Sequence, residues 1–153
     1  MTESRIPEAI DAIIAALTTA QPDLQVWDGP IISGDYTNAV YIGFDGQYED
    51  SEELAVSAQQ EWAGIGRNAR NEDLQITCSV VVLTGNADTA WKPTRDAAYS
   101  IIEAVGQVLR ADPSVGLPPP VVAELVPGDF YQETGPAGMQ ARVLFSIHLK
   151  TRV

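Results

Sequence analysis

The chain has 153 residues, of which 45% are hydrophobic and 20% are charged, and its formal net charge is −12. A chain of this length and composition fits one globular domain, and it excludes wholesale disorder. The acidic balance excludes tight wrapping of nucleic acid, because that affinity comes largely from lysine and arginine side chains that release counterions from phosphate.

The N-terminal segment predicts one amphipathic helix and one short strand. Apolar residues recur at helical spacing from Ile6 to Ala20, and Pro22 ends the pattern. A strand is expected over Leu24 to Trp27, before the turn sequence at Asp28 to Pro30. Because no basic region precedes an apolar stretch and no apolar run approaches about 20 residues, we expect neither a secretory signal nor a membrane span.

Three strands are expected in the middle of the chain. Ala39 to Phe44 favours a short strand, and an acidic loop from Asp45 to Glu53 follows it. Leu54 to Ala63 alternates more weakly, so that a helix is the alternative there, whereas Asp73 to Leu83 alternates over most of its length. The polar connection from Gly64 to Asn71 then predicts a large hairpin between the last two strands.

The single cysteine, Cys78, falls on the apolar side of the longest of these strands. A buried free cysteine behaves as a small hydrophobic residue, and we expect inert packing there rather than a reactive thiol. One cysteine cannot form an intrachain disulfide, which suits a reducing cytoplasm.

The C-terminal half predicts a second helix and three strands. The helix is expected over Trp91 to Arg110, followed by strands at Val121 to Val126 and Phe130 to Glu133. The last strand runs from Met139 to Lys150, with the cleanest alternation in the chain. Two helices and several hairpin-connected strands predict a single-domain α+β fold over residues 1–153. Its sheet should be mixed and mostly antiparallel, with the two amphipathic helices packed on one face.

No pattern in the chain predicts a catalytic, cofactor-binding or metal site. Gly64 to Ala69 matches the G-x-G-x-x-A dinucleotide fingerprint, but it precedes a strand instead of opening a helix. The acidic loop lacks the ligand spacing of a calcium loop. His148 is the only histidine, which disfavours histidine-based metal clusters and relays. Paired carboxylates for acid–base catalysis stay open, because 21 acidic residues always offer some pair.

The expected hairpin and the solvent side of the sheet carry features of a partner surface. Arg67 and Arg70 form a close pair of arginines in an acidic chain. They either keep the loop soluble or contact an acidic neighbour such as an identical subunit. Val81, Leu83 and Leu144 fall on the side of the sheet expected to face solvent, which is then more apolar than a free monomer needs. The candidate subunit-interface residues are Trp62, Ile65, Arg67, Arg70 and Leu144.

The order of these elements and several short runs of sequence resemble one known family. The runs are VWDGP, AVYIGF, SAQQEWAGIGRNARNEDLQITCSVVVLTGN, VLRADPSVG and ARVLFSIHLKTR. Over nearly its whole length the chain resembles the tail terminator proteins of long-tailed (siphovirus-type) phages of actinobacteria. The run around QEWAGIG, followed by the strand that contains ITC, is the most distinctive part of the likeness.

The resemblance implies a virion structural protein and no enzyme. Members of this family form a hexameric ring that caps the completed tail tube, stops its growth and docks to the head–tail connector or stopper protein. DNA would pass through the ring without specific binding, and no cofactor or membrane would be involved. The expected location is the neck region of the virion tail, after assembly in the host cytoplasm. The alternatives are another head–tail joining or tail-tube component and, in a different class, a small acidic hydrolase that uses paired carboxylates.

Overall fold

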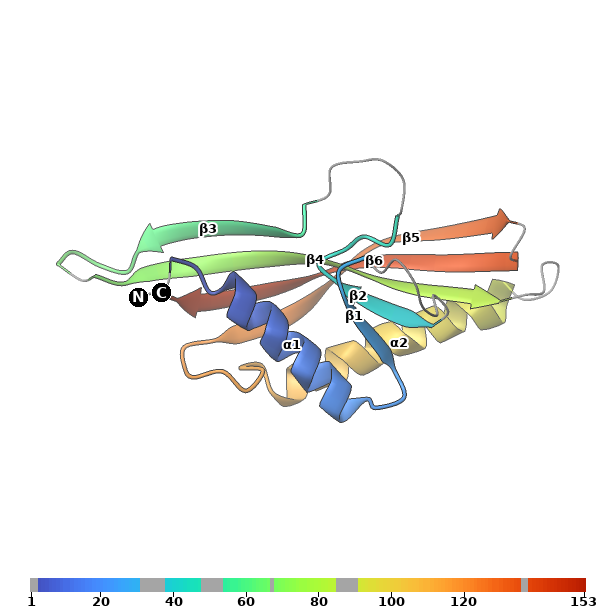
Figure 1. The fold of residues 1–153 in the computed structure, drawn as a ribbon, viewed down its shortest axis with the longest axis horizontal. Helices are drawn as coiled ribbons and strands as arrows, with labels where there is room; N and C mark the ends of the chain where they lie inside the picture. The colour runs from blue at the N-terminus through green and yellow to red at the C-terminus, as the bar shows by residue number, and fades with distance from the viewer. Residues whose placement is uncertain (1–2, 31–37, 48–53, 67, 85–90, 136–137) are drawn as a thin grey trace.

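The computed structural model describes residues 3–30, 38–47, 54–66, 68–84, 91–135 and 138–153. Within these residues, two helices pack against a six-stranded, mostly antiparallel sheet (Figure 1). The predicted α+β fold class is therefore confirmed. The elements in chain order are α1 (Ile6–Ala20), β1 (Gln25–Asp28), β2 (Ala39–Ile42), β3 (Val56–Trp62), β4 (Arg70–Thr84), α2 (Trp91–Ala111), β5 (Val122–Gly135) and β6 (Gly138–Arg152).

The sheet is built around its two long strands, β4 and β6, which pair antiparallel over nearly their full lengths. The strand order is β1-β2-β4-β6-β5, and only β1 and β2 run parallel. β3 also pairs with β4, on the same side of β4 as β2. β2 takes the second half of β4 and β3 takes the first half, so β3 lies on the edge of the sheet at one end of the molecule.

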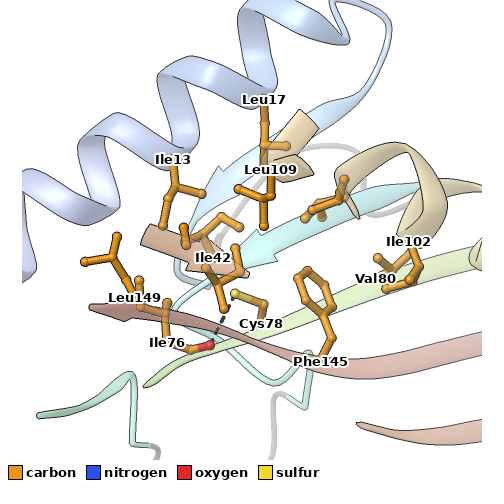
Figure 2. Packing of buried hydrophobic residues seen from close by; sticks show 14 of the residues in the cluster. Ile13, Leu17, Ile42, Ile76, Cys78, Val80, Ile102, Leu109, Phe145 and Leu149 are labelled. Atoms are coloured by element: carbon orange, nitrogen blue, oxygen red, sulfur yellow. Dashed lines mark hydrogen bonds between the residues drawn. The ribbon is translucent and has the colours of Figure 1, made fainter. Parts of the chain in front are cut away.

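One face of the sheet is covered by both helices and forms the main core. Alternate residues of β4 point toward this face, including Ile76, Cys78 and Val80. In Figure 2, Ile13 and Leu17 of α1 point from their helix toward these strand side chains. Each fully buried aliphatic side chain of this kind contributes about 1.5–3 kcal/mol through the hydrophobic effect. Because each helix and strand buries one side, apolar residues recur at helical spacing in α1 and α2 and at every second position in the strands.

The structure corrects the prediction for the strand after the proline-rich linker. The two short strands that the sequence predicts there are one strand, β5, which pairs with β6 on both sides of an irregularity between Pro127 and Phe130. Pro127 carries no N–H to donate to a neighbouring strand, and a bulge lets the pairing resume beyond it. Further upstream, residues 56–62 form a strand and not the alternative helix.

The opposite face of the sheet, here called the helix-free face, is partly covered by the chain that follows β2. The Ser79 hydroxyl donates to the Phe44 carbonyl oxygen over 3.0 Å. The Arg142 guanidinium donates to the Asp45 carbonyl oxygen over 2.8 Å. Val81, which the sequence assigned to the solvent side, is buried in a second apolar cluster. Its burial follows because the connection after β2 folds back over the sheet.

Gly46 is the tightest point of this cover. It has φ +83°, and a Cβ added to it would lie 2.9 Å from Cδ of Arg142 and 3.0 Å from Oγ of Ser79. Gly66 has φ +78° with nothing within 4 Å among the described residues, so it is a matched control. We expect Gly66→Ala to lower the free energy of unfolding by about 1–2 kcal/mol through backbone strain alone. Gly46→Ala should lower it by about 1–3 kcal/mol more, because the added methyl group overpacks the site. Urea unfolding measures both, and equal costs would contradict this packing.

Cys78 is buried in the main core, and its thiol donates to the Ile76 carbonyl oxygen over 3.5 Å (Figure 2). Burial raises the pKa of this thiol from the ordinary 9.0 to about 12. The neutral thiol therefore stabilises the fold fully below about pH 9, and this contribution is lost as the pH rises toward 12.

At pH 10 the loss should reach about 1 kcal/mol, because the unfolded thiol ionises while the folded one stays neutral. Comparing urea unfolding at pH 7 and pH 10 for the natural chain and for Cys78→Ala isolates this contribution. The alanine variant should lose less stability between the two pH values. An identical loss in both chains would show that Cys78 ionises as readily in the fold as in the unfolded chain.

Candidate assembly surface

The β3–β4 hairpin is the most extended feature of the molecule. The two strands pair from Val56 opposite Ile76 to Trp62 opposite Arg70, and the Ala63 N–H then donates to the Ala69 carbonyl oxygen over 2.9 Å. Figure 1 shows that the turn of this hairpin projects beyond both chain ends, at one end of the long axis of the molecule. Of its described residues, Gly64, Ile65, Gly66 and Asn68 are exposed.

Two large apolar side chains lie exposed at this turn, and together they are called the hairpin tip. Trp62 is 68% exposed and Ile65 is fully exposed. With Gly64, Gly66 and Asn68 they line a shallow hollow of about 550 Å³. A single exposed apolar residue is ordinary on a protein surface, whereas two neighbouring large ones on a projecting turn make this turn the candidate contact surface.

The base of the hairpin is fixed to the N-terminal segment through a buried carboxylate. Glu72 is fully buried, and one of its oxygens accepts the Arg5 backbone N–H over 2.7 Å. The other oxygen accepts the Gln60 side-chain amide over 2.6 Å. The same amide nitrogen lies 2.7 Å from the Glu3 carbonyl oxygen, to which it also donates. These bonds satisfy the carboxylate and hold β3, β4 and the N-terminal segment together.

Arg70 is the first residue of β4, directly opposite Trp62 and next to the turn. Its guanidinium forms an ion pair of 3.1 Å with Glu3. Its backbone exchanges two hydrogen bonds with Val153, of 3.1 and 2.8 Å. Arg70 therefore has partners within its own subunit. The other candidate arginine, Arg67, lies outside the described residues.

Leu144 lies far from the hairpin tip. It is half-buried on the helix-free face in the middle of β6, paired with Ser79 of β4. Nine residues separate Ser79 from Arg70 along β4, which places Leu144 roughly 30 Å from Arg70. The structure thus brings Trp62, Ile65 and Arg70 to one end of the molecule and leaves Leu144 on a separate surface.

The outer edge of β3 has no strand paired to it within the described part of the chain. Ala63 bonds toward β4, and antiparallel bonding alternates, so the backbone groups of Ala58, Gln60 and Trp62 point outward. The β5 edge differs, because Pro127 and the irregularity after it interrupt that strand. Of the β3 and β5 edges, β3 is the one that offers continuous unpaired backbone among the described residues.

The sequence patterns that suggested chemistry do not form a site in the described residues. The G-x-G-x-x-A run is the turn between two antiparallel strands, and the dinucleotide fingerprint requires a strand that leads into a helix. Of the acidic loop, residues 48–53 lie outside the described residues, and the Asp45 carboxylate accepts the Gln47 N–H over 2.9 Å. Over the described ranges, no group of three or more His, Cys, Asp or Glu is arranged to hold a metal ion. Neither described helix has the length and apolar character needed to cross a membrane.

Two buried charged residues were missed at the sequence level. Glu72 is in phase with Leu74 and Ile76 on the apolar side of β4, and that alternation could have marked it as buried. Arg142 falls on the polar side of β6, and no sequence signal shows that the chain after β2 covers it. Comparison of the chain with models of protein families and with curated proteins found no match.

Proposed function

We propose that this chain is a phage tail terminator. Identical copies close into a ring, which we expect to be a hexamer, on the end of the completed tail tube, stop its growth and join the tail to the head connector or stopper protein. The observation that carries the proposal is the projecting hairpin tip, with exposed Trp62 and Ile65 on an anchored arm. The likeness of element order and sequence runs to that family supports the same function.

An apolar tip of this kind is explained by assembly. In a free subunit it would face water, whereas a ring of copies would bury it in an interface core, where aromatic residues are enriched. The anchoring of the hairpin by Glu72 is a second reason to expect that it binds a partner. An arm held by Glu72 loses little conformational entropy on docking, so more of the contact free energy remains for binding.

The logic of capping follows from symmetry. A tube grows because the two faces of each ring are complementary and the contact between rings never closes. A terminator must match the tube on one face and present a different surface to the connector on the other. Specificity of this kind comes from the shape of the interfaces, which agrees with a chain that presents an exposed hairpin tip and an unpaired β3 edge.

The acidic balance suits a ring through which DNA passes. With a net charge of −12, the subunits repel phosphate, and a lumen lined by acidic side chains would let DNA slide without adhering. The ring would act in the neck of the virion tail after assembly in the host cytoplasm. A ring whose lumen proved neutral or basic would contradict this part of the proposal.

Polymerising tail tube protein with and without the purified chain tests the capping function. We expect shorter tubes, each with one extra ring at a single end, in electron micrographs. Tubes of unchanged length would contradict the proposal. Incorporation of the chain along the tube wall would instead favour the alternative, a tail-tube component.

A further inference from the structure

A groove lies between the C-terminal halves of α1 and α2, on the side of the helices that faces away from the core, and we call it the helix groove. Its volume is about 700 Å³. Small and aliphatic side chains line it, and Asp112 is the only charged residue among them. The Asp112 carboxylate accepts the N–H groups of Ser114 and Gly116, over 3.2 and 3.0 Å, so it is engaged within its own turn. Representative lining residues are Ala12, Ala15, Val108, Ala111, Val115 and Leu117.

We propose that the hairpin tip of one copy docks into the helix groove of the next copy. The inference rests on the proposed ring and names the two surfaces that make its contact. The tip supplies Trp62 and Ile65 as a projecting apolar pair, and the groove supplies an apolar recess. The groove is an open depression of the surface, so the two side chains of the tip can reach its apolar lining from solvent.

Charge favours a second copy as the occupant. The chain carries 21 acidic and 9 basic residues, so most pairs of surfaces on two copies repel each other. Residues 62–69 of the turn contain no carboxylate and one charged residue, Arg67, and the groove lining carries only Asp112. Tip and groove are therefore two surfaces on which copies can approach without bringing many carboxylates together.

A second groove of similar size shows why charge decides between the two. It lies between α2 and β5, is also about 700 Å³, and is lined by Glu103, Arg110 and Glu124 among others. Docking an apolar tip there would take these charged groups out of water without new partners, which is costly. The helix groove lacks this obstacle, so we assign the tip to it and use the second groove as a control.

The contact is heterologous, because the tip and the helix groove are different surfaces of the same chain. Each copy then uses its tip on one neighbour and its groove on the other, and the contact repeats until the ring closes. A contact that repeated without closing would give filaments, and a two-fold exchange of tips would stop at dimers.

Cross-linking between separately labelled chains tests the contact. One chain carries Ile65→Cys and the other carries Ala15→Cys, and a short bis-maleimide joins the two in assembled rings. A control mixture pairs Ile65→Cys with Val122→Cys, since Val122 is 58% exposed and lines the second groove. Cys78 stays in place, because its buried thiol does not react. We expect at least ten times more joined dimer in the first mixture than in the control.

A single chain with both Ile65→Cys and Ala15→Cys extends the test. We expect a ladder of joined species up to the ring size. Rings that form without preferential joining of positions 65 and 15 would overturn the inference and leave the proposed function intact. A ladder that stops at dimers would overturn the heterologous contact. Failure of the natural chain to form rings with or without tail tubes would overturn the proposed function and this inference together.

Discussion

Replacing Ile65 by aspartate is expected to abolish ring formation while the subunit stays folded. Ile65 is fully exposed in the subunit, so the fold loses almost nothing when its side chain changes. In the assembled contact the aspartate would be buried without a partner. Losing a central interface residue costs at least about 2 kcal/mol, which weakens each contact about 30-fold. Because the same contact recurs at every subunit boundary of the ring, this loss of binding free energy is incurred once for each contact.

A matched variant separates this effect from a general loss of exposed apolar surface. Leu54 is 67% exposed and lies just before β3, at the end of the hairpin away from the turn. Leu54→Asp should still assemble, and both variants should unfold within about 0.5 kcal/mol of the natural chain. Sedimentation across a concentration series measures assembly. Rings of Ile65→Asp at the concentrations at which the natural chain assembles would show that the tip is not part of the contact.

Replacing Glu72 by alanine is expected to lower the stability of the subunit by about 3 kcal/mol. The change removes two hydrogen bonds to a buried charged group, one from the Arg5 N–H and one from the Gln60 amide, although the exposed Gln60 keeps its bond to the Glu3 carbonyl oxygen. Hydrogen bonds to charged groups contribute about 1.5–3 kcal/mol each. For a chain of this size, that loss corresponds to a decrease in Tm of roughly 6–12 °C.

Asp73 is the control for this prediction, because it is the next residue of β4 and its side chain is exposed. Asp73→Ala should leave Tm nearly unchanged. Hydrogen exchange in β3 should also accelerate in Glu72→Ala, since the carboxylate joins β3 to the N-terminal segment. Equal Tm values for the two variants would mean that the buried carboxylate does not hold the base of the hairpin.

The parts of the fold that sequence reasoning predicted well are those governed by local periodicity. α1 occupies the predicted residues, because its apolar stripe and its terminating proline are both local signals. β5 was predicted as two strands, because Pro127 breaks the local pattern and only pairing with β6 joins the two halves. The burial of Val81 depends on the chain that folds over the helix-free face, and no local pattern contains that contact.

The candidate surface was predictable in part for the same reason. Trp62 and Ile65 could be placed at a hairpin turn from the strands on either side of them. The partner of Arg70 could not be predicted, because Glu3 lies 67 residues away in the sequence. The helix groove needs the relative placement of α1 and α2, which are joined through four intervening strands.

Electron microscopy of the purified chain, alone and bound to tail tubes, with the particle mass measured in parallel, tests the ring most directly. We predict a closed ring with a central hole and a mass of six chains, seated at one end of each tube. A chain that stays a single subunit under both conditions, with bare tube ends, would contradict the account.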